Sequence, residues 1–190
     1  MKYSKSLVLL IVFSFPACAF ASDAIQAPPQ LPRVALMEVL DSASKTTKMR
    51  FVVNEHAAPS IVIGQVNPRK LTYAELLIIL KNNDLAAVKV DDLVNIVPVK
   101  TVRQHALPTV QGFSDALADE EWVSMLVLIK NIPATQLVPI MRPLLPQAGH
   151  LAANPASNTI MLVDRYGNAK RVARMIAEMD AKAAAIARAD

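Results

Sequence analysis

A succession of short apolar runs and helical-period segments between residues 125 and 180 constrains the fold of this chain more than any other feature. Residues 125–129 are wholly apolar and are followed by Lys130 and Asn131, which favours a short strand covered on both faces. Residues 159–163 form a second apolar run after a turn rich in Asn, Pro and Ser. The pattern predicts strands and helices packed into one small unit, closed by an amphipathic helix that reaches Asp180.

Prolines set the bounds of the first helix in this unit. Pro139 fits a helix that begins near Thr135, because its missing N–H then falls about where no partner is needed. Pro143 and Pro146 are predicted to kink or end the helix. Few aromatic residues are available, so we expect aliphatic cores with methionine as core or near-core filler, at Met125, Met141, Met161, Met175 and Met179.

The preceding segment, residues 33–100, shows the order helix, strand, strand, helix, strand, strand, with room for an extra strand ahead of it. Its clearest signal is a capping box, in which Thr72 starts a helix and Glu75 reaches back to it. Asp91 and Asp92 separate two β-prone runs, which predicts a hairpin.

The two segments resemble consecutive domains of bacterial secretins. Residues 122–180 resemble the N1 domain, and the resemblance rests on these residues: 126–129, Asn131, Ala134, Leu137, Pro139, Ile140, Asn154, Ser157, Asn158, 160–163, Ile176, Met179 and Asp180. Residues 33–100 resemble the N0 domain, which is related to the signalling domain of TonB-dependent receptors, and the matching residues are Val39, Leu40, 51–53, 61–63, Leu71, Thr72, 75–77, Leu85 and 94–98.

The resemblance implies an α+β fold class, with two small α/β domains in tandem. We expect an N0-like domain at 33–100, a linker at 101–121, an N1-like domain at 122–180 and an Ala-rich, helical tail at 181–190. The resemblance also implies protein partners from a type II secretion or type IV pilus machine, namely an inner-membrane platform protein and secretin subunits. Homo-oligomers of the chain itself are a further expectation.

Two surfaces are candidates for these contacts. The strand edge at Ile61, Val62 and Ile63 could accept an added partner strand. The basic helix face of Lys170, Arg171 and Arg174 could meet a neighbouring ring subunit, whereas a solvated helix face explains the same residues without a partner.

The N-terminus carries an export signal. Residues 1–21 combine a basic start, a short apolar run and an A-x-A site, which predicts cleavage between Ala21 and Ser22. A lipoprotein anchored at Cys18 is the less favoured alternative, because residues 15–17 depart from a lipobox. A tether at 22–32 follows, and the mature protein is expected in the periplasm, where a secretin complex could link it to the outer membrane.

The residues give little sign of chemistry. His56, His105 and His150 are far apart, and the phosphate-loop, dinucleotide and nucleophile-elbow motifs are missing, so we expect no catalytic, metal or cofactor site and no small-molecule substrate. The net charge of +4 includes Lys2 and Lys5 of the signal, which leaves too small an excess to indicate nucleic acid. The Gly-x-x-Gly loop with which KH domains grip RNA is also missing.

Three interpretations of function remain open at this point. The favoured one is a periplasmic interaction module of a secretin-type apparatus, which is not itself a pore because the chain holds no set of strands long enough for the channel. The alternative is a stand-alone signalling domain like those of TonB-dependent receptors. The third is a split secretin whose remaining domains lie on a neighbouring chain.

Overall fold

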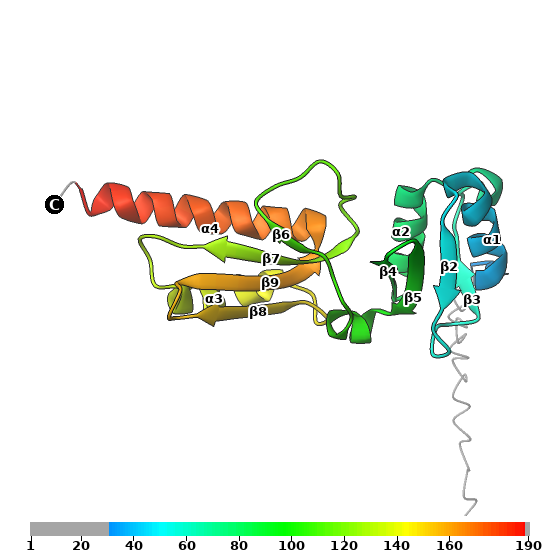
Figure 1. The fold of residues 1–190 in the computed structure, drawn as a ribbon, viewed down its shortest axis with the longest axis horizontal. Coiled ribbons are helices and arrows are strands. Elements are labelled where there is room, and N and C mark those ends of the chain that lie inside the picture. Colours follow the sequence, from blue (N-terminus) through cyan, green and yellow to red (C-terminus); the bar gives the residue numbers. More distant parts are fainter. Residues whose placement is uncertain (1–30, 189–190) are drawn as a thin grey trace, which may run out of the picture. The chain divides into compact units, whose positions relative to one another are not determined.

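The computed structural model describes residues 31–188, which fold as helices packed against several small mixed sheets (Figure 1). This is the α+β class that the sequence predicts. The signal peptide, the cleavage site at Ala21 and Ser22, the lipidation alternative at Cys18 and nearly all of the tether lie outside the described residues.

The N-terminal half, which we define as residues 31–104, contains two sheets. Its elements are β1 (Arg33–Ala35), α1 (Leu36–Thr47), β2 (Arg50–Val53), β3 (Ser60–Val62), η1 (Pro68–Lys70), α2 (Tyr73–Asn82), β4 (Leu85–Val90), β5 (Leu93–Pro98) and η2 (Val99–Gln104). Strands β1 and β3 form an antiparallel pair, while β5 lies between a parallel β2 and an antiparallel β4. The extra strand for which the sequence leaves room is β1.

Local signals place the helix and the hairpin of this half where the sequence predicts them. The Thr72 hydroxyl accepts from the backbone N–H of Glu75, and the Glu75 carboxylate accepts from the backbone N–H of Thr72, so the capping box is confirmed. Asp91 adopts a φ of 53° in the turn between β4 and β5. A left-handed turn residue of this kind suits the twist of a tight hairpin.

One aliphatic cluster holds this half together. Val39 and Leu40 of α1 meet Leu76 and Leu80 of α2, with Ile96 of β5 among them, and each is no more than 2% exposed. Burying an aliphatic side chain of this size stabilises a fold by about 1.5–3 kcal/mol.

The C-terminal half, residues 105–188, contains a single four-stranded sheet. Its elements are β6 (Thr109–Gln111), β7 (Trp122–Leu128), α3 (Ala134–Met141), η3 (Arg142–Leu144), β8 (His150–Asn154), β9 (Thr159–Arg165) and α4 (Tyr166–Ile186). The strand order is β6-β7-β9-β8, with β6 parallel to β7 and the other pairs antiparallel.

Both helices of this half pack on one face of that sheet. Met125 of β7 pairs with Leu162 of β9, which pairs with Leu151 of β8, and this row joins Leu137 of α3 and Ile176 of α4 in a second aliphatic cluster. Figure 1 shows α4 running alongside the sheet. The opposite face carries the alternate residues of each strand, because successive side chains of a strand point to opposite sides.

Two side chains lock the loop between β7 and α3. The Asp180 carboxylate, on α4, accepts from the backbone N–H groups of Lys130, Asn131 and Ile132 at 3.1, 2.7 and 3.0 Å. The Asn158 amide donates to the Ile132 carbonyl and accepts from the N–H of Ala134, at 3.0 and 2.7 Å. Asn131, Asn158 and Asp180 are among the residues on which the resemblance rests, and these contacts give each of them a structural role in this loop.

A third, smaller cluster joins the two halves. Val88 of β4 and Val97 of β5 pack with Val102 of η2 against Trp122 of β7 and Val163 of β9. Trp122 and Val163 lie on the sheet face opposite α3 and α4, since their neighbours in each strand point toward the helices. The N-terminal half therefore covers one end of that face.

Several sequence expectations were wrong in detail. Residues 109–111, placed in a linker of little regular structure, form β6 and pair with β7. Pro139 lies at the sixth position of α3, beyond the helix start, so the helix loses one internal hydrogen bond there. The helix does end before Pro143, as predicted, and passes into η3.

The strands of the C-terminal half are not covered on both faces along their whole length. Leu126 and Leu128 of β7 are 37% and 66% exposed, and Met161 of β9 is 41% exposed. Met175 is also 38% exposed, so the expectation of core or near-core positions for all five methionines was wrong for Met161 and Met175. Short apolar runs cannot reveal which face stays open, because both faces carry apolar residues.

Candidate interaction surfaces

The predicted strand edge on β3 is partly occupied by the protein itself. The backbone N–H of Val62 donates to Asn83 Oδ1, and the Val62 carbonyl accepts from Asn83 Nδ2, both at 2.8 Å. Ile61 is fully buried, and Ile63 lies just after the end of the strand. A partner strand added at Val62 would therefore have to displace the Asn83 side chain, and partner binding at this edge stays a prediction.

An apolar groove lies beside this edge. It has a volume of about 400 Å³ and lies between β3 and α2, where its lining residues include Val62, Ile63, Val66, Ile78 and Ile79. Ile78 is 48% exposed, which is unusual for an isoleucine on a well-packed helix. The groove and the strand edge form one continuous apolar surface on the N-terminal half.

The predicted basic helix face makes contacts within the protein. Lys170 Nζ lies 2.7 Å from Asp119 Oδ1, and Arg174 lies over the Phe113 ring at 5.0 Å. Arg171 Nε donates to Asn168 Oδ1 at 2.9 Å. Arg171 and Arg174 nevertheless stay exposed at the surface, and their role in a ring contact stays a prediction.

An open apolar face on the four-stranded sheet was not predicted from the sequence. Leu126 of β7 pairs with Met161 of β9. Leu128 lies two residues further along β7, on the same face of the sheet and further from the N-terminal half. All three side chains point away from α3 and α4, beyond the end that Trp122 and Val163 occupy. Leu126, Leu128 and Met161 alternate along their strands with residues that face the helices. Because those neighbours are also apolar, the sequence shows no alternation of apolar and polar residues that would reveal the open face.

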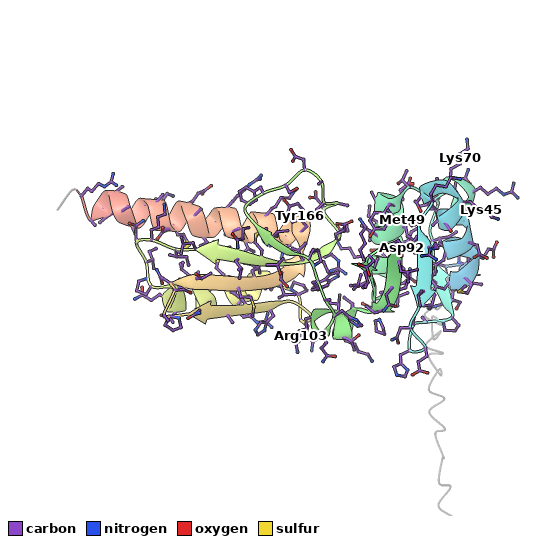
Figure 2. All side chains as sticks on the ribbon, viewed as in Figure 1. Lys45, Met49, Lys70, Asp92, Arg103 and Tyr166 are labelled. Atoms are coloured by element: carbon purple, nitrogen blue, oxygen red, sulfur yellow. The ribbon has the colours of Figure 1, made fainter. Side chains whose placement is uncertain are left out.

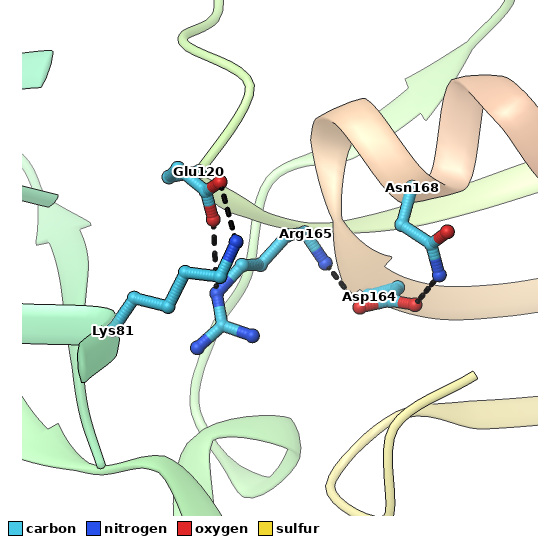
Figure 3. A network of polar contacts seen from close by, with 5 residues as sticks. All are labelled: Lys81, Glu120, Asp164, Arg165 and Asn168. Atoms are coloured by element: carbon cyan, nitrogen blue, oxygen red, sulfur yellow. Dashed lines mark hydrogen bonds and ion pairs between the residues drawn. The ribbon is translucent and has the colours of Figure 1, made fainter. Parts of the chain in front are cut away.

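A network of charges holds the two halves together around Glu120 (Figure 3). Lys81 Nζ, from α2, lies 2.7 Å from Glu120 Oε1, and Arg165 Nε, from β9, lies 3.3 Å from Glu120 Oε2. The adjacent Glu121 is 7% exposed in its side chain and pairs with Lys89 Nζ of β4 at 2.6 Å. The acidic residues of the predicted linker therefore contact both halves, which no local pattern could indicate.

Burial perturbs two titratable groups near this network. Burial, with the neighbouring Glu121 carboxylate, raises the pKa of Tyr73. Burial also raises the pKa of Asp164, although a hydrogen bond from Asn168 Nδ2 at 2.5 Å opposes the shift. Both groups lie in packed surroundings at the junction of the two halves.

The three histidines lie on different parts of the fold. His56 lies in the turn after β2, His105 follows η2, and His150 begins β8. Across residues 31–188, no three His, Cys, Asp or Glu side chains are placed to hold a metal ion. In the same part of the chain, no helix combines the length and apolar character needed to cross a membrane.

The chain is similar in sequence to two secretins. It is 26% identical over 151 residues to secretin XcpQ of Pseudomonas aeruginosa, and 29% identical over 129 residues to secretin GspD 2 of Escherichia coli O78:H11. The matches cover 77% and 63% of this chain, which spans about a fifth of the length of these relatives, 22% and 19%. No family model matches the chain.

A solved structure shares the fold. A chain of the Klebsiella pneumoniae type II secretion system outer membrane complex, which contains PulD, PulS and the PulC HR domain, aligns with a TM-score of 0.65 at 19% identity. The alignment covers 79% of this chain and 26% of that chain. The likeness supports the fold described above.

Proposed function

We propose that this chain is a periplasmic protein–protein interaction module of a secretin-type secretion apparatus, of the type II or type IV pilus kind. The homology to secretin N-terminal domains over 77% of the chain carries this proposal. The Klebsiella complex, in which PulD occurs together with PulS and the PulC HR domain, supports partners that are proteins.

In this proposal, residues 122–180 form an N1-like domain that meets a neighbouring ring subunit. The open apolar face at Leu126, Leu128 and Met161 would receive the exposed side of α4 from the next subunit, where Arg171 and Arg174 lie. Exposed apolar residues gathered on one sheet face are typical of a protein contact. The two surfaces of a head-to-tail contact would thus come from two different faces of one domain.

Residues 33–100 form an N0-like domain in the same proposal, and they meet an inner-membrane platform protein. The groove between β3 and α2 is the contact site, since Ile78 and Val62 there offer apolar surface beside a strand edge. Asn83, which holds the edge closed, would then decide whether a partner strand can add.

A tagged chain recovered from the periplasm under mild cross-linking tests both contacts. We expect secretion or pilus components in the recovered material. With Leu128→Lys, the recovered material should lack secretin subunits and still contain platform components. With Ile78→Lys, it should lack platform components and still contain secretin subunits. Thr46→Lys adds the same charge on the exposed side of α1 and serves as the matched control.

The pattern of losses decides between the interpretations. Recovery that is unchanged in both variants would contradict the assigned surfaces. A partner with a single membrane span and a regulatory output, in place of secretion components, would instead favour a stand-alone signalling domain.

A further inference from the structure

A cleft lined by cationic side chains lies beside the junction of the two halves. Its volume is about 550 Å³, within the range of ligand-binding clefts. Four of its lining residues carry a positive charge and come from three elements, α2, η2 and β9: Lys81, Lys100, Arg103 and Arg165. Arg103 is labelled on η2 in Figure 2.

The positive charge of this cleft is not cancelled within the protein. Glu120 is shared by Lys81 and Arg165, and Asp84 is the single carboxylate that lines the cleft itself. Within residues 31–188, neither Lys100 nor Arg103 has a carboxylate oxygen within 4.0 Å. Asp164, next to Arg165 in the chain, is a third carboxylate that acts on its guanidinium. Four cations therefore face three carboxylates, and the excess of positive charge lies at Lys100 and Arg103.

A buried tryptophan, Trp122, lines the cleft. Trp122 is 2% exposed, yet its Nε1–H has no hydrogen-bond acceptor within the described part of the chain. Arg165 lies over the Trp122 ring at 5.0 Å, which holds the guanidinium beside the indole. The indole ring and the Arg165 guanidinium therefore form part of the cleft wall.

We propose that this cleft binds an acidic peptide segment of a partner protein, with carboxylates meeting Lys100 and Arg103 beside the wall that Trp122 and Arg165 form. Lys100 and Arg103 lie three residues apart on η2, while Lys81 and Arg165 come from α2 and β9. This spread of positive charge suits several carboxylates along a chain rather than one compact anion. Val99, Pro146 and Ala148 supply apolar lining between them, which a peptide backbone and methylene groups can cover. The inference concerns a surface separate from both contacts of the proposed function.

Trp122 reports on binding directly, because it is the one tryptophan in the sequence. We would titrate the purified chain with hexaglutamate at low salt and follow tryptophan fluorescence, with hexaglutamine as the uncharged probe. Saturable binding of hexaglutamate, weakened by added salt and not seen with hexaglutamine, is expected. No saturable change with hexaglutamate would overturn the proposal.

Variants separate the cleft from general attraction to a basic protein. Lys100→Gln with Arg103→Gln should weaken hexaglutamate binding by about fivefold to thirtyfold, since exposed charge pairs contribute about 0.5–1 kcal/mol each. Lys45→Gln with Lys70→Gln removes two charges from the N-terminal half, at positions labelled in Figure 2, and should leave binding unchanged.

Two further outcomes count against the proposal. Equal losses in both double variants would show non-specific attraction. Inorganic phosphate that competes fully at the same charge concentration would indicate a site for compact anions. Circular dichroism of each variant confirms that the fold is kept, and failure here leaves the pull-down result of the proposed function unaffected.

Discussion

Asp180 should be among the most sensitive single positions of the C-terminal half. Its carboxylate accepts the three backbone N–H groups of the loop that leads into α3, and also the Asn131 side-chain amide at 3.1 Å. The residue is 9% exposed, so water cannot fully replace these bonds. Each hydrogen bond to a charged group contributes about 1.5–3 kcal/mol, although bonds to one carboxylate are not additive.

We therefore expect Asp180→Asn to lower the free energy of unfolding by about 2 kcal/mol, because the amide keeps one acceptor oxygen and turns an NH₂ group toward donors. Asp180→Ala should cost about 3 kcal/mol, since all acceptors are lost. Glu178→Gln, an exposed carboxylate on the same helix, is the matched control and should change stability by less than about 0.5 kcal/mol. Urea unfolding followed by circular dichroism measures all three.

The pH dependence gives a sharper test of the same contact. Burial alone would raise the pKa of Asp180, but the hydrogen bonds from Asn131, Lys130 and Ile132 outweigh it and lower the pKa below the ordinary value of 3.8. A lowered native pKa means that the stabilisation is present above the unfolded pKa and is lost as the pH falls through the native one. The wild type and Asp180→Asn should therefore converge at low pH. A difference that is absent at pH 7, or that stays constant down to pH 2, would refute the reasoning.

Three further changes test other contacts by the same unfolding assay. Thr72→Ala should cost about 1 kcal/mol, because the α2 cap is lost, and an unchanged midpoint would contradict that role. Tyr166→Phe should cost about 1 kcal/mol, since the hydroxyl bonds both the N–H and the carbonyl of Ser114; proteolysis between residues 112 and 118 should also quicken. Glu121→Gln should lower the free energy of unfolding by about 1–2 kcal/mol, because Glu121 is the buried partner of its ion pair with Lys89. High salt should not lower the stability of the wild type by the same amount, since a buried charge is poorly screened.

The sequence predicts those parts of the fold that depend on near neighbours. The capping box at Thr72 and the hairpin at Asp91 each need only a few adjacent residues, so both could be placed correctly. The strands β1 and β6 are three residues long, which is too short for any alternation to show. They become strands because β3 and β7 offer them an edge.

The surfaces were harder to predict because they depend on distant contacts. Asn83 looks like an ordinary helix stop, yet its side chain closes the β3 edge 21 residues away. Glu120 lies in a stretch that composition assigns to a linker. Its ion pairs are with Lys81 of α2 and Arg165 of β9, which are distant in the sequence, so no local pattern could predict them. Leu128 looked buried, since nothing in the run shows that α3 and α4 cover one face alone.

Disulfide cross-linking between copies tests the central proposal, the head-to-tail contact of the C-terminal half, most directly. Leu128→Cys with Arg174→Cys would be made in the chain from Ser22 onward, which contains no cysteine of its own. The two positions lie on opposite faces of the domain and cannot join within one copy. We expect a ladder of linked copies from periplasm that contains the secretion apparatus, and none with Thr46→Cys and Arg174→Cys. Monomers alone from the first pair, or equal ladders from both, would contradict the account.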